Sequence, residues 1–138
     1  MPPTYELDAT PEGDELTELY DAVGWTAYTR DPDRLAAAVA GSASVATARE
    51  DGRLVGLARV VGDGHTIAYL QDVLVDPGHR RGGIGRELVR LAFSPFAHVR
   101  QQVLITDDEP GQHAFYTSLG FTAAHELEHP VRAFVRFS

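Results

Sequence analysis

The sequence predicts a mixed α/β fold in which helices flank a sheet, and three observations support this prediction. An apolar, β-branched run over residues 66–75 is typical of a buried strand, and Pro77-Gly78 ends it because proline offers no ladder N–H. From position 84 the apolar residues follow helical spacing, as Ile84, Leu88, Leu91 and Ala92. Asp51-Gly52 and Asp63-Gly64 are typical of tight hairpin turns, which join antiparallel strands.

The chain before the central strand supplies two helices and three further strands. Thr10-Pro11 and Asp31-Pro32 each predict a helix start, because an N-cap side chain is followed by proline at the first helical position. The predicted elements are, in order, a strand over 3–8, a helix over 11–23, a helix over 31–40, and strands over 44–50 and 53–62.

The chain after the central strand continues to alternate helix and strand. Ser94-Pro95 breaks the first of these helices, and Glu109-Pro110 starts another that Gly120 stops. The predicted elements are a helix over 83–93, a strand over 99–106, a helix over 109–119, and strands over 121–125 and 130–137. Neither a repeat nor a linker interrupts this order, so we expect residues 1–138 to form a single domain.

The composition excludes several kinds of chemistry and partner. The chain contains neither cysteine nor lysine, which excludes disulfides, thiolate metal sites and Schiff-base chemistry. A net charge of −8 argues against a nucleic-acid partner. No apolar stretch approaches the ~20 residues of a membrane span, and the N-terminus lacks a signal pattern, so we expect a cytoplasmic protein without a membrane partner. The cluster His125, Glu126, Glu128 and His129 lacks convincing ligand geometry, so we predict no metal.

The turn between the central strand and the next helix is rich in glycine and arginine. Backbone N–H groups can converge in such a turn, and the helix N-terminus adds partial positive charge, so the pattern is typical of a phosphate site. Arg80 and Arg81 add guanidinium groups that match phosphate oxygens. The stretch lacks the lysine of a Walker loop, and its glycines at 78, 82, 83 and 85 do not fit the dinucleotide fingerprint.

The motif Arg80-x-x-Gly83-x-Gly85 resembles the Arg/Gln-x-x-Gly-x-Gly/Ala signature of the GNAT superfamily of N-acetyltransferases. The preceding strand, the following amphipathic helix and Phe115-Tyr116-x-x-x-Gly120-Phe121 extend the resemblance over residues 53–121, with a looser match in the first fifty residues. It implies the GNAT fold, a mostly antiparallel twisted sheet of about six to seven strands flanked by about four helices.

The resemblance also implies a site for acetyl-CoA (coenzyme A). In the family, backbone N–H groups of the loop hold the pyrophosphate, here those around Arg81, Gly83, Ile84, Gly85 and Arg86, with charge added by Arg80 or Arg81. Gly82 stands where the family more often has a larger, frequently basic residue. A main-chain N–H of a bulged strand faces the acetyl carbonyl, here near Val73, Leu74 and Val75. Tyr116 corresponds to the family's tyrosine that protonates the thiolate of coenzyme A. The alternative interpretation is that Tyr116 is an aromatic residue of the core.

The acceptor side is predicted from charge and from aromatic residues. Asp72 is the only acid within the central strand, where it either holds or deprotonates the amine or forms an ion pair, for which Arg59 is the candidate partner. Trp25 and Tyr28 follow the first helix, in the region that lines the acceptor site in the family, although Trp25 could instead close the core. Residues 1–50 carry 10 acidic and 3 basic side chains, a balance of −7 that favours a small cationic amine.

The sequence thus predicts an acetyl-CoA-dependent enzyme that transfers an acetyl group directly to a primary amine. One alternative is a non-catalytic acyl-CoA-binding sensor or partner module of the same fold. Others are a protein acceptor or a different acyl donor such as succinyl-CoA. Family members often pair through their C-terminal strands, here roughly residues 121–137, so the resemblance also implies a homodimer.

Overall fold

The structure, a computed structural model, describes residues 2–80 and 82–138, and these divide into two compact units. The first unit ends at Ile105 and contains the sheet. The second unit, Thr106–Ser138, contains one α-helix within its described residues. Each unit is described by itself below.

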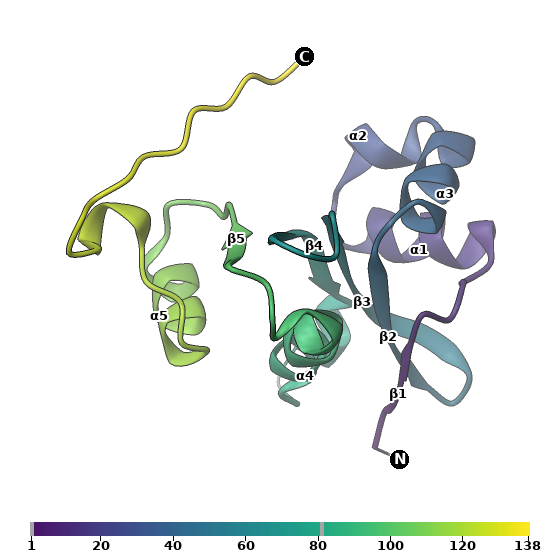
Figure 1. The fold of residues 1–138 in the computed structure, drawn as a ribbon. Helices are drawn as coiled ribbons and strands as arrows, with labels where there is room; N and C mark the ends of the chain where they lie inside the picture. Colours follow the sequence, from purple (N-terminus) through teal and green to yellow (C-terminus); the bar gives the residue numbers. More distant parts are fainter. Residues whose placement is uncertain (1, 81) are drawn as a thin grey trace. The chain divides into compact units, whose positions relative to one another are not determined.

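The first unit is a five-stranded sheet with helices on both faces (Figure 1). The strands stand in the order of the chain, each antiparallel to the one before except β5, which runs parallel to β4. They are β1 Thr4–Leu7, β2 Ser44–Glu50, β3 Arg53–Gly62, β4 Ile67–Val75 and β5 Gln101–Leu104. The helices are α1 Gly13–Ala22, α2 Thr26–Thr29, α3 Pro32–Ala40 and α4 Ile84–Phe93, with short 3-10 turns η1 Pro77–His79 and η2 Ser94–Phe96.

Local chemistry explains several element boundaries, and the predicted start of α1 is wrong. Asp51 and Gly52 both take positive φ (50° and 79°), as the predicted tight turn between β2 and β3 requires. The Asp31 carboxylate accepts the N–H of Arg34 at 3.1 Å and caps α3, as predicted. Helix α1, however, begins at Gly13 and not at Pro11, because the side chains of Glu12 and Glu15 cap each other's backbone N–H groups.

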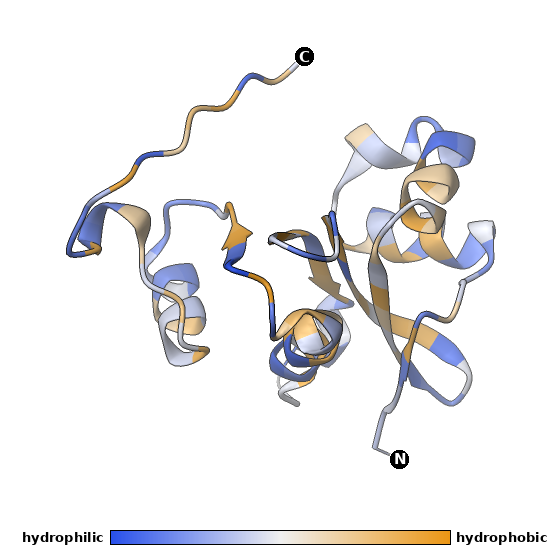
Figure 2. Cartoon of the chain, in the orientation of Figure 1, coloured by the Kyte–Doolittle hydropathy of each residue, from blue (hydrophilic) through white to orange (hydrophobic). Residues whose placement is uncertain are grey.

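Two layers of apolar side chains hold the helices to the sheet. On one face, α1 and α3 bury Leu16, Leu19, Tyr20, Leu35 and Val39 against Val45, Leu54, Leu57 and Leu74. On the other face, α4 lies so close to β3 that a Cβ at Gly56 would come within 2.8 Å of Leu88. Hydrophobic residues accordingly dominate β3 and β4 (Figure 2). None of the helices in the described parts of the chain has the length and apolar character needed to cross a membrane.

The second unit differs from the prediction. Helix α5 spans Pro110–Ser118, close to its predicted bounds, and the 3-10 turn η3 spans Ala124–Glu126. The predicted strands over 121–125 and 130–137 are absent from the described residues, so the sheet has five strands and not six to seven. A strand needs a partner for its backbone groups, and this unit offers none among its described residues, so β-propensity alone does not produce a ladder. The short helix α2 was not predicted.

Candidate functional site

The glycine loop joins β4 to α4 through η1. Asp76 fixes its start, because its carboxylate accepts the N–H of Gly78 at 2.9 Å. Gly83 has φ +74°, a conformation that favours glycine, and it immediately precedes α4. A Cβ added at Gly82 or Gly83 would meet no described atom within 4 Å. The loop therefore leaves open space beside the first turn of α4, where helix N–H groups lack acceptors within the helix.

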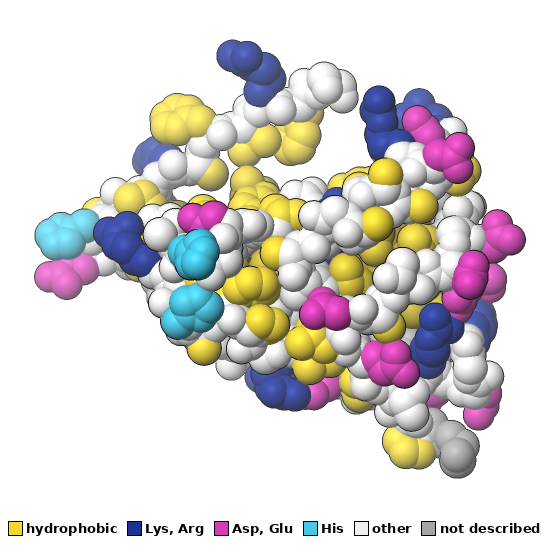
Figure 3. All heavy atoms as spheres, turned by 45° about the vertical axis from the view of Figure 1, so that its right-hand side comes forward, with side chains coloured by type: hydrophobic (Ala, Val, Ile, Leu, Met, Phe, Trp, Pro, Cys, Tyr) yellow, Lys and Arg dark blue, Asp and Glu magenta, His cyan; other side chains and the backbone are white. Residues whose placement is uncertain are grey.

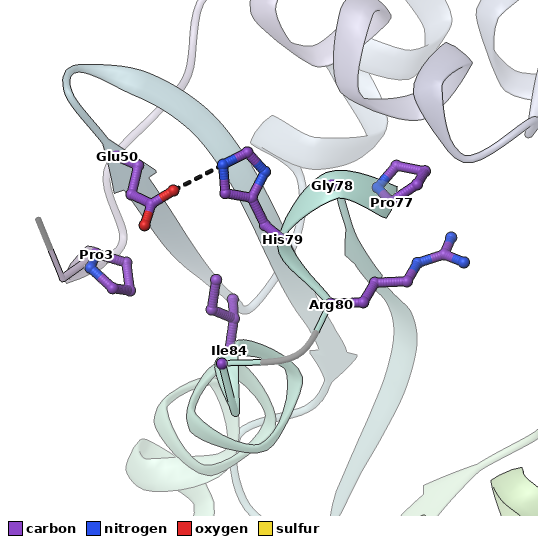
Figure 4. A pocket seen from close by; sticks show the side chains of 8 residues that line it. Pro3, Glu50, Pro77, Gly78, His79, Arg80 and Ile84 are labelled. Atoms are coloured by element: carbon purple, nitrogen blue, oxygen red, sulfur yellow. Dashed lines mark ion pairs between the residues drawn. The ribbon is translucent and has the colours of Figure 1, made fainter.

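A pocket of about 340 Å³ adjoins this loop. His79 lies between two carboxylates, with Nε2 2.7 Å from Glu50 and Nδ1 3.3 Å from Asp76. Arg80 extends away from Glu50 and His79 (Figure 4), and its Nε donates to the carbonyl of Val75 at 3.4 Å. Arg81 lies outside the described residues. The pocket is lined by Pro3, Glu50, Pro77, Gly78, His79, Arg80, Gly82 and Ile84.

The loop should lose stability in acid. The Gly78 N–H and then the His79 side chain lower the pKa of Asp76, against the opposing effect of burial. A lowered carboxyl pKa contributes stability above the unfolded value of about 3.9, and the contribution is lost as pH falls through the folded value. We expect the melting temperature of the wild type to fall below about pH 4 more steeply than that of Asp76→Asn. Melting curves recorded between pH 2 and 7 test this, and parallel acid limbs in the two proteins would contradict it.

Strand β4 has a bulge and an open edge. Arg59 on β3 pairs with Asp72, but the next residue, Val60, pairs with Leu70, so Gln71 has no counterpart on β3. On its other edge, β4 pairs with β5 only over Ile67–Leu70. Among the described residues, Val73, Leu74 and Val75 therefore have no strand neighbour on that edge. An extended ligand can pair with backbone groups exposed in this way.

Asp72 is the acceptor of a buried hydrogen-bond network. Its Oδ2 accepts from Arg59 Nε at 2.6 Å and from the Tyr20 hydroxyl at 2.9 Å, and its Oδ1 accepts from the Tyr28 hydroxyl at 3.3 Å. Asp72 is 3% exposed and Arg59 6%. Burial and then the Asp72 charge raise the pKa of Tyr20 well above its ordinary value, so Tyr20 stays a donor. The ion pair with Arg59, one of the alternatives predicted from the sequence, is thus present.

Trp25 and Tyr28 lie beside this network. Tyr28 lies on α2, and Trp25 immediately precedes that helix. The rings of Tyr20, Trp25 and Tyr28 have centroids 5.4 to 6.1 Å apart, and Tyr20 meets each of the other two edge to face. Both Trp25 and Tyr28 are partly buried against the core, so each has a packing role as well as a candidate binding role. The structure therefore brings three predicted acceptor-side residues, Trp25, Tyr28 and Asp72, together in the first unit.

Tyr116 belongs to the second unit, on α5. It is buried within that unit and packs edge to face with Phe115 and Phe121, whose ring centroids lie 4.9 and 6.2 Å away. Burial raises the pKa of its phenol, which therefore keeps its proton at neutral pH. The residue has the protonation state that a general acid requires.

Comparison with known proteins identifies the family. The profile of a family described as "Acetyltransferase (GNAT) domain" matches residues 41–123, which is more than half of the chain. This chain belongs to the GNAT acetyltransferase family. The matched region contains β2 to β5, the glycine loop, α4 and α5, whereas α1 and α2 precede it.

Individual GNAT relatives agree with this assignment. A GNAT-family acetyltransferase of Streptococcus pneumoniae TIGR4 has a TM-score of 0.84 and 29% identity, covering 99% of both chains. AAC(6')-Iy, solved with the bisubstrate analogue CoA-S-monomethyl-acetylneamine, has a TM-score of 0.74 over 99% of this chain and 98% of its own, but at 15% identity it shows the fold alone. Histone acetyltransferase TAP1 of Glycine max is 33% identical over 81% of this chain and 52% of its own length. The chain spans about half the length of the curated relatives it matches.

The GNAT motifs did not indicate two polar residues beside Asp72 and Tyr28. Tyr20 carries no motif, although a buried phenol usually needs a hydrogen-bond partner. Gln71 carries no motif, and its amide Nε2 lies 3.5 Å from the Tyr28 hydroxyl only because of the β4 bulge. Tyr20 could have been found from the burial that its position on an amphipathic helix indicates, whereas Gln71 required the register of β3 against β4.

Proposed function

We propose that this GNAT-family chain is an acetyl-CoA-dependent N-acetyltransferase that acts by direct transfer on a primary amine, preferably a small cationic one. The observation that carries the proposal is the bulged strand β4 followed by the open glycine loop and the N-terminus of α4. We infer that both units belong to one transferase domain over residues 1–138, because the family profile extends from the first unit into the second.

The loop would hold the pyrophosphate of acetyl-CoA, which supplies the activated acetyl group when bound. Backbone N–H groups around Gly83, Ile84, Gly85 and Arg86 suit an anion because they begin α4. Arg80, with Arg81 next to it in sequence, would add positive charge. The unpaired edge over Val73, Leu74 and Val75 would pair with the extended arm of the ligand and direct an N–H at the acetyl carbonyl. Gly82, which has no side chain, would leave the approach to the loop open.

The proposed chemical roles follow from which side chains can donate or accept a proton. Tyr116, a neutral phenol whose pKa burial raises further, would donate its proton to the departing sulfur. Asp72 would take the proton that the amine nitrogen loses on attack, relayed by the Tyr28 hydroxyl, which donates to Asp72 Oδ1. The other oxygen, Oδ2, already accepts from Arg59 and Tyr20. Trp25 and Tyr28 would present ring faces to a cationic acceptor, and the acidic residues of α1 would attract it.

Tyr116→Phe tests the proposal. Acetyl-CoA is titrated by calorimetry, and thiol release is then followed with butylamine, spermidine and a lysine-containing peptide. The peptide is included because one relative is named a histone acetyltransferase. We expect saturable binding, turnover of at least one amine, and a fall in kcat of about 100-fold in Tyr116→Phe with unchanged acetyl-CoA affinity. Tyr5→Phe on β1 is the matched control and should behave as the wild type.

The outcomes separate the alternatives. Binding of acetyl-CoA without turnover of any amine or peptide would favour an acyl-CoA-binding module. Turnover of the peptide alone would favour a protein acceptor. Thiol release from succinyl-CoA but not from acetyl-CoA would favour a different acyl donor. Unchanged kcat in Tyr116→Phe would assign this residue to the core and not to catalysis.

We further propose that two copies associate through residues 130–137. This segment is extended (Figure 1), and hydrophobic side chains lie among those on the molecular surface (Figure 3). Its side chains Phe134 and Phe137 are 95% and 87% exposed. Exposed apolar residues with high β-propensity are typical of an interaction surface. Strand β5 is last in the sheet, and its outer edge has no partner strand in the parts of the chain that the structure describes. Each copy thus offers both an extended segment and a strand edge, which permits a closed two-fold pair.

The dimer can be measured directly. Sedimentation equilibrium should give twice the chain mass of 15.0 kDa for the wild type. Replacing both Phe134 and Phe137 by Ser should yield a monomer, since it removes the most exposed apolar side chains of the segment. Leu7→Ser on β1, an exposed apolar residue outside residues 121–137, is the control and should remain a dimer. A wild type that sediments as a monomer at micromolar concentration would contradict the proposal.

A further inference from the structure

The β4 bulge places two consecutive polar side chains on the same side of the sheet. In a regular strand, neighbouring residues face opposite sides. Here Asp72 Oδ1 lies 3.3 Å and Gln71 Nε2 lies 3.5 Å from one atom, the hydroxyl oxygen of Tyr28. The bulge therefore combines an exposed amide, a phenol and a buried carboxylate beside α2.

The hydrogen bonds in this group leave acceptor atoms available. The Tyr28 hydroxyl donates its proton to Asp72, so its oxygen lone pairs remain for other donors. The Gln71 amide contacts Tyr28 through Nε2 at the limit of hydrogen-bond distance, and its carbonyl oxygen has no partner among the described residues. By contrast, Asp72 Oδ2 is fully engaged by Arg59 and Tyr20.

This surface carries little net charge. The guanidinium of Arg59 neutralises Asp72, with which it is buried. Tyr69, two residues before the bulge on β4, is close enough to Tyr28 and Asp72 that both raise the pKa of its phenol, after burial itself. The side chains on this side of the bulge are therefore neutral phenols and an amide. Oxygen acceptors of this kind receive the N–H groups of an amine, and an amine nitrogen has the lone pair that attack requires only in its uncharged form.

We propose that Gln71 is a specificity-determining residue that, together with Tyr28, binds the acceptor as a neutral primary amine. The inference rests on the proposed function. A neutral primary amine has two N–H donors and one lone pair. The Gln71 carbonyl oxygen and the Tyr28 hydroxyl oxygen would accept the two N–H groups, which leaves the lone pair for attack. A secondary amine has only one N–H and would leave one of these acceptors unsatisfied.

The test compares Gln71→Leu with Gln101→Leu, a control of the same residue type that is exposed on the neighbouring strand β5. The probe is butylamine with saturating acetyl-CoA, and N-methylbutylamine is the secondary-amine comparison. In Gln71→Leu we expect KM for butylamine to rise about five- to tenfold while kcat and acetyl-CoA affinity stay unchanged, as for the loss of one neutral hydrogen bond. The ratio of kcat/KM for butylamine to kcat/KM for N-methylbutylamine should fall by a similar factor. Because Gln71 is exposed, the Gln71→Leu variant should have the same melting temperature as the Gln101→Leu control.

A second readout does not depend on turnover. Trp25 is the only tryptophan, and its ring centroid lies 6.1 Å from that of Tyr28, so its fluorescence should report butylamine binding in the presence of coenzyme A. The apparent Kd should rise in Gln71→Leu and not in Gln101→Leu. Binding that depends on Gln71 without turnover would support the recognition site and overturn the transferase. Turnover with the same KM and the same amine preference in Gln71→Leu would overturn this inference alone.

Discussion

Asp72→Ala is expected to lower the free energy of unfolding by about 3–5 kcal/mol, because it leaves the guanidinium of Arg59 buried without its anion. The substitution also removes the acceptor of two tyrosine hydroxyls, and of these Tyr20 is completely buried. Urea denaturation followed by circular dichroism measures the change.

The double variant Arg59→Met/Asp72→Leu provides the matched control. It removes both charges and keeps the volume, so the stability lost to the unpaired guanidinium should return, whereas the buried Tyr20 hydroxyl still lacks its acceptor. A cost that is equal in the single and double variants would mean that the unsatisfied Tyr20 hydroxyl, and not the unpaired charge, causes the destabilisation. A cost below about 1 kcal/mol for Asp72→Ala would contradict the buried ion pair itself.

Gly83→Trp is expected to abolish saturable acetyl-CoA binding. The site of the new side chain is open space beside the first turn of α4, where the pyrophosphate is proposed to lie. Isothermal calorimetry on the wild type and the variant measures the effect, with a melting curve to confirm that the variant is folded.

Gly64→Trp is the control for Gly83→Trp. Gly64 has φ +78°, close to the +74° of Gly83, and a Cβ there also meets no described atom within 4 Å. Both variants therefore carry the same backbone strain, about 1–2 kcal/mol, but Gly64 lies in the turn between β3 and β4 and not in the loop. Equal loss of binding in the two variants would attribute the effect to strain and would refute the cofactor site.

The proposed acetyl-CoA site and the proposed acceptor site thus depend on different residues. Gly83 and Arg80 belong to the loop, whereas Gln71, Asp72 and Tyr28 belong to the β4 bulge and α2. Loss of acetyl-CoA binding in a loop variant, with intact amine recognition, would show that the two functions are separable in the first unit.

The sequence alone determined the features that depend on neighbouring residues. The turn at Asp51-Gly52 and the cap at Asp31 lie where they were predicted, because each needs only two to four adjacent residues. The glycine loop was predictable for the same reason: Gly83 must take positive φ just before a helix whose apolar spacing is visible in the sequence. The family resemblance rested on these local features and is confirmed.

The tertiary structure decided what depends on partners distant in the chain. Residues 130–137 have the composition of a strand, but a strand forms only where another strand satisfies its backbone groups. The alternation of a regular strand would separate Gln71 from Asp72, and only the register of β3 against β4 shows the bulge that brings both to Tyr28. Whether Asp72 is paired was likewise open in the sequence, because its donors come from α1, α2 and β3 and meet only after these elements pack.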